Sequence, residues 1–220
     1  GLDAMGYAVW TGAESNSWSE QTNWNPLSVP TSSSNVLIPA SSNNPISSGS
    51  IEISELILQS DAALTLQNNH TLLIDNNLQN NGSITLQATD ASNYAQLKFN
   101  GAYSGSGMVT QQQNLNAGWN LISSSMNATE ASHFGNIGTN AIGATSNTRN
   151  LYSWDGAQYV NIPDNLANIT PGTGYFGFVG TLGFQAAAGL TNFTGTPNTS
   201  VLSTSLSFSN PAGGITFTIN

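Results

Sequence analysis

The stretch IEISELILQSDAALTLQNNHTLLIDNNLQNNGSITL, residues 51–86, decides the fold of this chain. Its apolar residues alternate with polar ones in very short runs, for example Leu64-Thr-Leu66 and Ile84-Thr-Leu86. Alternation over so few residues is typical of short β-strands that bury one side. Asparagine pairs such as Asn68-Asn69 and Asn76-Asn77 separate the runs, and asparagine tolerates the left-handed backbone of a tight turn. The stretch therefore predicts short strands joined by tight corners.

Similar apolar residues recur in this stretch at a spacing of 20 positions. The pairs are Leu58 and Leu78, Leu64 and Ile84, and Leu66 and Leu86. Such a period suits one coil of a parallel β-helix, in which each coil stacks its apolar residues on the next. We therefore expect a solenoid over roughly residues 36–112, with these pairs in parallel register. A run of hairpins in a sandwich is the alternative, because it also gives short strands.

The sequence changes in character from Gly118 onward. Aromatic residues become dense and are flanked by glycine, as in Gly118-Trp119-Asn120-Leu121-Ile122 and Gly174-Tyr175-Phe176-Gly177-Phe178. This pattern is typical of an antiparallel β-sandwich with large core residues. The polar run Gln111-Gln112-Gln113-Asn114 is the predicted boundary. The sequence thus predicts an all-β chain, with a capped β-solenoid in residues 1–112 and a β-sandwich in residues 113–220.

The composition excludes several functions. The 220 residues carry two cations and eleven acids, a net charge of −9, and only 6% are charged. A protein with two cations cannot neutralise a row of phosphates, so nucleic acid and anionic membrane surfaces are not expected partners. The apolar runs are far shorter than the roughly 20 residues that span a bilayer, so no membrane insertion is expected. A surface of uncharged polar residues is unusual for a cytosolic enzyme and favours an extracellular or cell-surface location, although a chance bias in composition is the alternative.

Several motifs resemble the large secreted surface proteins of Bacteroidetes bacteria. The N-terminal part of the resemblance is Trp10-Thr11-Gly12, Trp18, Asn23-Trp24, Val29-Pro30 and Val36-Leu-Ile38-Pro39. The C-terminal part is Gly118-Trp119-Asn120-Leu121-Ile122-Ser123, Tyr152-Ser-Trp154-Asp155 and Pro171-Gly-Thr-Gly174-Tyr175. The resemblance implies a repetitive solenoid followed by a second module, export by the type IX system, and a role as an adhesin or surface-layer component. The usual C-terminal sorting domain of that family has no counterpart here, so we expect this chain to be part of a longer protein.

The sequence offers little for catalysis, and we expect a protein that is not an enzyme. The two histidines, His70 and His133, lie in no metal-binding spacing, and no serine occupies a G-x-S-x-G elbow. Lys98 and Arg149 are the only cations that could separate the pKa values of two acids. No cysteine is present for thiol chemistry or zinc.

Calcium is the one cofactor that the sequence leaves open. It takes carboxylate and carbonyl oxygens from loops, and Asp75 and Asp155 are the candidate ligands. No complete calcium-loop motif surrounds either residue, so the expectation is no cofactor, with calcium as the alternative.

The aromatic residues are the remaining functional candidates. Tyr152, Trp154 and Tyr159 surround a predicted turn at Asp155-Gly156. Aromatic rings can stack on sugars while nearby polar groups bind the hydroxyls, so the candidate ligand site consists of Tyr152, Trp154, Asp155 and Tyr159. The other four tryptophans are expected to be buried. Trp10, Trp18 and Trp24 would cap one end of the solenoid, and Trp119 would fill the sandwich core.

Three functional hypotheses follow. The first is a non-catalytic extracellular structural or adhesion module of a larger bacterial surface protein. The second is a carbohydrate-binding module, and the third is a filament subunit assembled by β-strand addition. The expected partners are a surface polysaccharide or another copy of a surface protein. The alternating residues Ile215, Phe217 and Ile219 predict a terminal strand that either closes the sandwich of its own chain, which we favour, or pairs with a neighbour.

Overall fold

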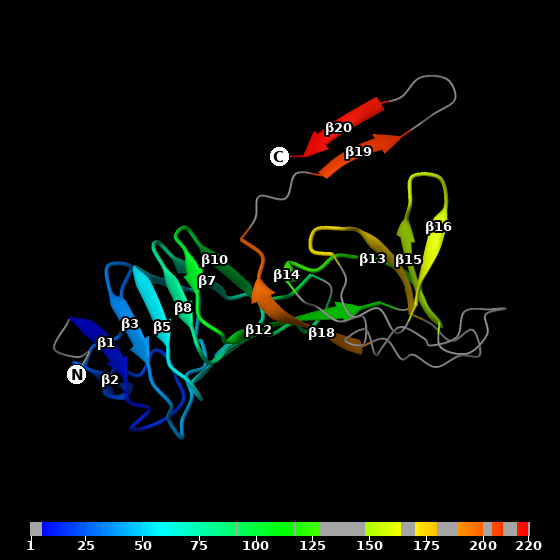
Figure 1. Cartoon of the computed structure of the whole chain (residues 1–220). Helices are drawn as coiled ribbons and strands as arrows, with labels where there is room; N and C mark the ends of the chain where they lie inside the picture. Colours follow the sequence, from blue (N-terminus) through cyan, green and yellow to red (C-terminus); the bar gives the residue numbers. More distant parts are fainter. Residues whose placement is uncertain are drawn as a thin grey trace.

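The computed structural model describes residues 6–90, 92–116, 118–127, 148–163, 170–179, 189–199, 204–208 and 215–219. The chain is nearly all β, as the sequence predicts. A solenoid of about three turns is followed by antiparallel sheets (Figure 1). The one helical element among the described residues is a 3-10 turn, η2 (Gln21–Asn23).

Three parallel sheets form the sides of the solenoid. The first contains β1 (Tyr7–Trp10), β3 (Asn35–Ile38), β5 (Glu55–Leu58), β8 (Leu78–Asn80) and β11 (Tyr103–Ser104), with β2 (Trp24–Asn25) antiparallel at its edge. The second contains β4 (Ile51–Ile53), β7 (Thr71–Ile74) and β10 (Gln96–Phe99). The third contains β6 (Ala63–Leu66), β9 (Ser83–Leu86) and β12 (Met108–Leu115). The coils β5–β6–β7 and β8–β9–β10 each contribute one strand to each sheet.

The strand register confirms two of the three predicted pairs. Leu64 lies opposite Ile84 and Leu66 opposite Leu86 in parallel strands. The third pair is wrong, because Leu78 lies opposite Leu56, a spacing of 22 instead of 20. The corner residues between strands differ in number from coil to coil, so the repeat length differs between the sheets.

The interior of the solenoid is a column of aliphatic side chains. The fully buried members include Leu56, Leu58, Leu64, Leu66, Leu72 and Ile74. One buried residue of the column is polar: the Asn80 amide donates to the carbonyl of Met108, and its oxygen accepts from the Gly82 N–H. Asn69 has a positive φ of 65°, so this corner asparagine takes the predicted left-handed conformation.

The three N-terminal tryptophans are buried, as predicted. Trp24 packs edge-on against both Trp10 and Trp18, with ring centroids 5.0 and 4.7 Å apart. The Trp24 indole donates to the Trp18 carbonyl at 2.9 Å, and the Trp10 indole donates to the Asn43 carbonyl at 2.7 Å. The cluster joins the solenoid core at its N-terminal end, where β1 and β2 lie (Figure 1).

The second half is built on strand β12. Beyond its parallel pairing with β9, β12 pairs antiparallel with β18 (Gly189–Pro197), which also carries β14 (Met126–Asn127). A four-stranded antiparallel sheet then contains β13 (Gly118–Ile122), β17 (Tyr175–Val179), β15 (Thr148–Trp154) and β16 (Tyr159–Pro163). The expected boundary at Gln111–Asn114 falls inside β12, and the division of the chain into domains stays a prediction.

The last two strands form a sheet of their own. β20 (Ile215–Ile219) pairs antiparallel with β19 (Thr204–Phe208), and no other described strand joins them (Figure 1). Ile215, Phe217 and Ile219 thus lie in a strand that pairs within its own chain, as favoured, but with β19 and not with the four-stranded sheet of Trp119. Closure of a sandwich by this strand stays a prediction. The strand exists, but its nearest sequence neighbour β19 supplies the pairing through a short connection.

Candidate functional site

One face of the four-stranded sheet carries a group of aromatic residues. Strand alternation and register place Tyr152 opposite Phe176 and Trp154 opposite Tyr159, with Trp119 on the same face of β13. We call Trp119, Tyr152, Trp154, Tyr159 and Phe176 the aromatic face. The structure therefore brings together the three aromatic residues predicted as a ligand site and adds two more.

The opposite face of this sheet forms a small second core. Its buried residues are Ile122, Leu151, Ile162 and Tyr175, together with Leu115 of β12 and Phe193 of β18. Because this core already buries one side of the sheet, the aromatic face is not needed to close it. The outward position of these aromatic side chains therefore needs an explanation other than core packing.

The rings of the aromatic face form a continuous series of contacts. Centroids lie 5.0 Å apart for Trp154 and Tyr159, and 5.5 Å for Tyr159 and Phe176. The series continues from Phe176 to Trp119 at 6.2 Å and from Trp119 to Tyr152 at 5.9 Å. These edge-to-face and tilted arrangements are the ones that aromatic quadrupoles prefer, so the rings hold one another in place.

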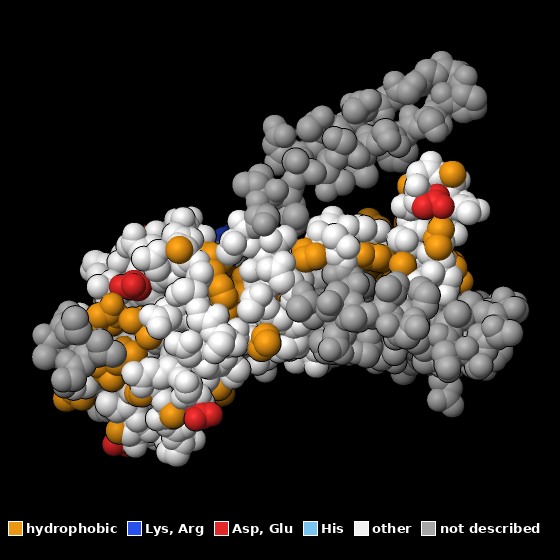
Figure 2. Space-filling model, viewed as in Figure 1, with side chains coloured by type: hydrophobic (Ala, Val, Ile, Leu, Met, Phe, Trp, Pro, Cys, Tyr) orange, Lys and Arg blue, Asp and Glu red, His pale blue; other side chains and the backbone are white. Residues whose placement is uncertain are grey.

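The aromatic face is exposed to solvent. Trp119, Trp154 and Tyr159 are 59, 55 and 56% exposed. Four of the five residues, all except Trp154, line a shallow apolar groove with a volume of about 310 Å³. Figure 2 shows hydrophobic side chains at the surface along this part of the molecule. Contiguous exposed aromatic surface of this kind usually marks a binding site.

The prediction that Trp119 is buried is wrong. Gly118, with a φ of +100°, precedes it, and β13 then places Trp119 and Leu121 outward while Ile122 points into the core. Phe176 was missed as a site residue. Its neighbour Tyr175 is the buried one, and adjacent aromatic residues in a strand give no sign of which faces outward.

Asp155 closes the turn between β15 and β16. Its Oδ1 accepts the N–H groups of Ala157 and Gln158, both at 2.8 Å, and Gly156 supplies a φ of +104°. These backbone donors, that of Gln158 first, lower the pKa of the Asp155 carboxyl below its ordinary value of 3.8. The carboxylate is thus part of the turn that positions Trp154 and Tyr159.

The lowered pKa of Asp155 has a measurable consequence. A carboxyl whose pKa is depressed in the folded state stabilises it above the unfolded pKa, and this contribution is lost as the pH falls through the folded pKa. We expect the turn to keep the slow amide exchange of Ala157 and Gln158 between pH 8 and pH 5. A carboxyl titration followed by NMR should give a midpoint below 3.8. A midpoint above that value would contradict the assigned role, and Asp155→Asn, which keeps an acceptor oxygen, serves as the control.

The two candidate calcium ligands, Asp75 and Asp155, do not lie close together. Asp75 follows β7 in a corner of the solenoid, whereas Asp155 lies at the β15–β16 turn. Within the described ranges, no three His, Asp or Glu side chains are grouped so that they could hold a metal ion.

A serine–histidine pair occurs in the solenoid. The Ser47 hydroxyl lies 2.7 Å from Nδ1 of His70, and it also accepts the N–H of Gln67 at 2.9 Å. Ser47 is only 1% exposed, so the pair supports a corner and offers no hydroxyl to a substrate. The sequence gives no sign of this contact because the two residues are 23 positions apart. His133 lies outside the described residues.

The chain belongs to a protein family described as a domain of unknown function, DUF8693, whose family model matches residues 9–219. The match spans both the solenoid and the aromatic face. No curated protein and no solved structure matches the chain. In the part of the chain that the structure describes, no helix has the length and apolar character needed to cross a membrane.

Proposed function

We propose that this protein is a non-catalytic adhesion module of a larger extracellular surface protein, and that its aromatic face binds carbohydrate. The observation that supports the proposal is the continuous series of exposed rings on a sheet whose other face is already packed. A ring presents a flat apolar surface to the C–H face of a sugar. Several adjoining rings would contact several sugar units of one chain.

The size and charge of the site favour an uncharged glycan. A groove of about 310 Å³ is at the lower end of the range for small-ligand sites, roughly 300–1,000 Å³, and suits a short piece of a polymer. Asp155 is the acid nearest in sequence to the ring residues Trp154 and Tyr159, and the chain as a whole carries a charge of −9. An acidic sugar would meet electrostatic repulsion, so a neutral surface polysaccharide is the expected ligand.

The test is an array of neutral and acidic glycans followed by calorimetry on the best neutral oligosaccharide. We expect Trp119→Ala to weaken binding about 30-fold, because Trp119 lines the groove between Tyr152 and Phe176 and removing a central aromatic anchor commonly costs about 2 kcal/mol. Trp119→Phe keeps a ring and should retain most of the affinity. Leu27→Ala, at an exposed apolar residue of the solenoid half, is the matched control and should leave affinity unchanged.

Two outcomes would overturn the proposal. One is an array with no neutral glycan bound. The other is binding that survives the double variant Trp119→Ala/Trp154→Ala without loss, which would place the ligand elsewhere on the protein.

A further inference from the structure

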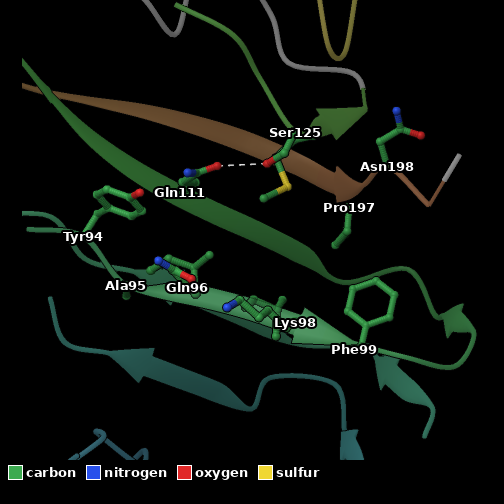
Figure 3. A pocket seen from close by; sticks show the side chains of 12 residues that line it. Tyr94, Ala95, Gln96, Lys98, Phe99, Gln111, Ser125, Pro197 and Asn198 are labelled. Carbon is green, nitrogen blue, oxygen red and sulfur yellow. Dashed lines mark hydrogen bonds between the residues drawn. The ribbon is translucent and has the colours of Figure 1, made fainter. Parts of the chain in front are cut away.

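A small cavity separates β10, the last strand of the second sheet, from the strands that follow the solenoid. Its volume is about 260 Å³. β10 forms one wall, and the β14–β18 pair together with Gln111 of β12 forms the other (Figure 3). Sites for drug-sized ligands have volumes of roughly 300–1,000 Å³, so this cavity suits a smaller ligand. It shares no lining residue with the groove of the aromatic face.

The backbone of β10 presents polar groups to this cavity. The N–H of Gln96 bonds to the carbonyl of His70 on the β7 side at 3.0 Å. Successive residues of a parallel strand turn their N–H and C=O to alternate edges, so those of Leu97 point away from β7. Leu97 is half-buried and lines the cavity, and β7 is the one partner of β10 among the described strands. A ligand in the cavity can therefore satisfy this strand edge.

The opposite wall offers a side-chain amide. The Ser125 hydroxyl donates to Oε1 of Gln111 at 2.9 Å, and Figure 3 shows this pair on the wall that faces β10. A carbonyl oxygen can accept two hydrogen bonds, so Oε1 of Gln111 keeps a lone pair for a further donor. The cavity thus has a donor on one wall, the Leu97 N–H, and an acceptor on the other.

Apolar and aromatic side chains complete the lining of the cavity. Leu86, Ala95 and Met126 are buried and supply a small apolar surface. Tyr94 is 42% exposed, so part of its ring is open to solvent beside the cavity. Gln96 adds a second side-chain amide. The lining therefore combines room for a methyl group, an aromatic ring and amides that can bind hydroxyls.

We propose that this cavity binds the acetamido group of a neutral N-acetylated amino sugar. The C=O and N–H of a trans amide point in opposite directions. The acetamido oxygen accepts from the Leu97 N–H, and the acetamido N–H donates to Oε1 of Gln111 across the cavity. The acetyl methyl contacts the buried apolar side chains, and the sugar ring lies against Tyr94. One ligand group thus satisfies both walls.

The lining favours this ligand over an anion and over a peptide. Lys98 is the one cation among the lining residues, but it alternates with Leu97 and Phe99 and lies exposed on the outer side of β10. An anion between the two walls would not meet this charge directly. A peptide carries the same amide group, but a peptide strand continues in both directions, and the β14–β18 wall leaves a space of only about 260 Å³.

The experiment is an NMR titration of the full chain with N-acetylglucosamine, followed at the backbone amide of Leu97. We expect a saturable shift of this amide signal. Glucose lacks the acetamido group, and acetate has a methyl and acceptor oxygens but no N–H. Both should bind at least about tenfold more weakly, because neither supplies the amide hydrogen bonds to the two walls.

Two variants test the opposite wall. Ser125 is exposed, so Ser125→Phe should fold, and its ring would occupy the cavity and abolish the shift. Ser123→Phe is the matched control, because Ser123 is equally exposed in the same segment but does not line the cavity, and this variant should keep the shift. Gln111→Leu keeps the approximate size of the side chain but removes the acceptor, and it should weaken binding about tenfold.

Three results would overturn the proposal: no shift at Leu97 with N-acetylglucosamine, glucose or acetate that binds as tightly, or a shift that survives Ser125→Phe. Tighter binding of a blocked alanine peptide than of the sugar would also overturn it and would make the cavity a peptide site. The double variant Trp119→Ala/Trp154→Ala should keep the shift at Leu97, so a failure of the aromatic-face proposal is distinguishable from a failure of this one.

Discussion

Replacing Trp24 by alanine is expected to lower the free energy of unfolding by about 3–5 kcal/mol, the usual loss when a buried aromatic side chain is removed. Trp24 is fully buried, contacts two other indole rings edge-on, and donates a hydrogen bond to the Trp18 carbonyl. The variant would leave a cavity at the N-terminal end of the solenoid and would deprive the Trp18 carbonyl of its donor. Both effects lower the free energy of unfolding.

Chemical denaturation followed by far-ultraviolet circular dichroism measures this loss. Trp154→Ala is the matched control, because it removes the same side chain from an exposed position and should cost under about 1 kcal/mol. A similar loss in the two variants would show that Trp24 does not stabilise the end of the solenoid.

Gly82→Ala should be the second strongly destabilising change, at about 3 kcal/mol. A Cβ at this position would lie 2.2 Å from the Ala62 carbonyl oxygen and 2.8 Å from that of Gln59. Both are backbone atoms of the preceding coil, and the Ala62 carbonyl also accepts the N–H of Ser83 at 2.9 Å. The coils would have to move apart locally to admit one methyl group.

Gly49→Ala provides the comparison, since a Cβ there meets no atom within 4 Å. This variant should stay within about 0.5 kcal/mol of the wild type in the same denaturation experiment. Equal stability of the two variants would mean that the coils are not as closely stacked at Gly82 as the structure describes.

The sequence predicted the solenoid because its apolar residues carry the stacking directly. Leu64 and Ile84 share a period, alternate with polar residues, and end at asparagine corners, so three signals agree. The number of residues in each corner, by contrast, cannot be read from the pattern of apolar residues. The pairing of Leu56 with Leu78 therefore had to come from the structure.

The candidate site was only partly predictable for a related reason. Tyr152, Trp154 and Tyr159 flank a turn whose Asp-Gly signature is visible in the sequence, and so their proximity was expected. In β13, Trp119 and Leu121 alternate with Asn120 and Ile122, and each set contains a large apolar residue. Which set faces inward depends on the core formed with distant residues such as Phe193, and local sequence cannot decide it.

Strand β12 has a mechanical consequence. It bonds to β9 on one edge and to β18 on the other, so the solenoid and the antiparallel sheets share one continuous ladder of backbone hydrogen bonds. A pull that separates the two halves would load many of these bonds at once in shear, instead of opening them one after another. A tension applied between the tryptophan end and the aromatic face would therefore be carried across the junction by this ladder as well as by the covalent chain.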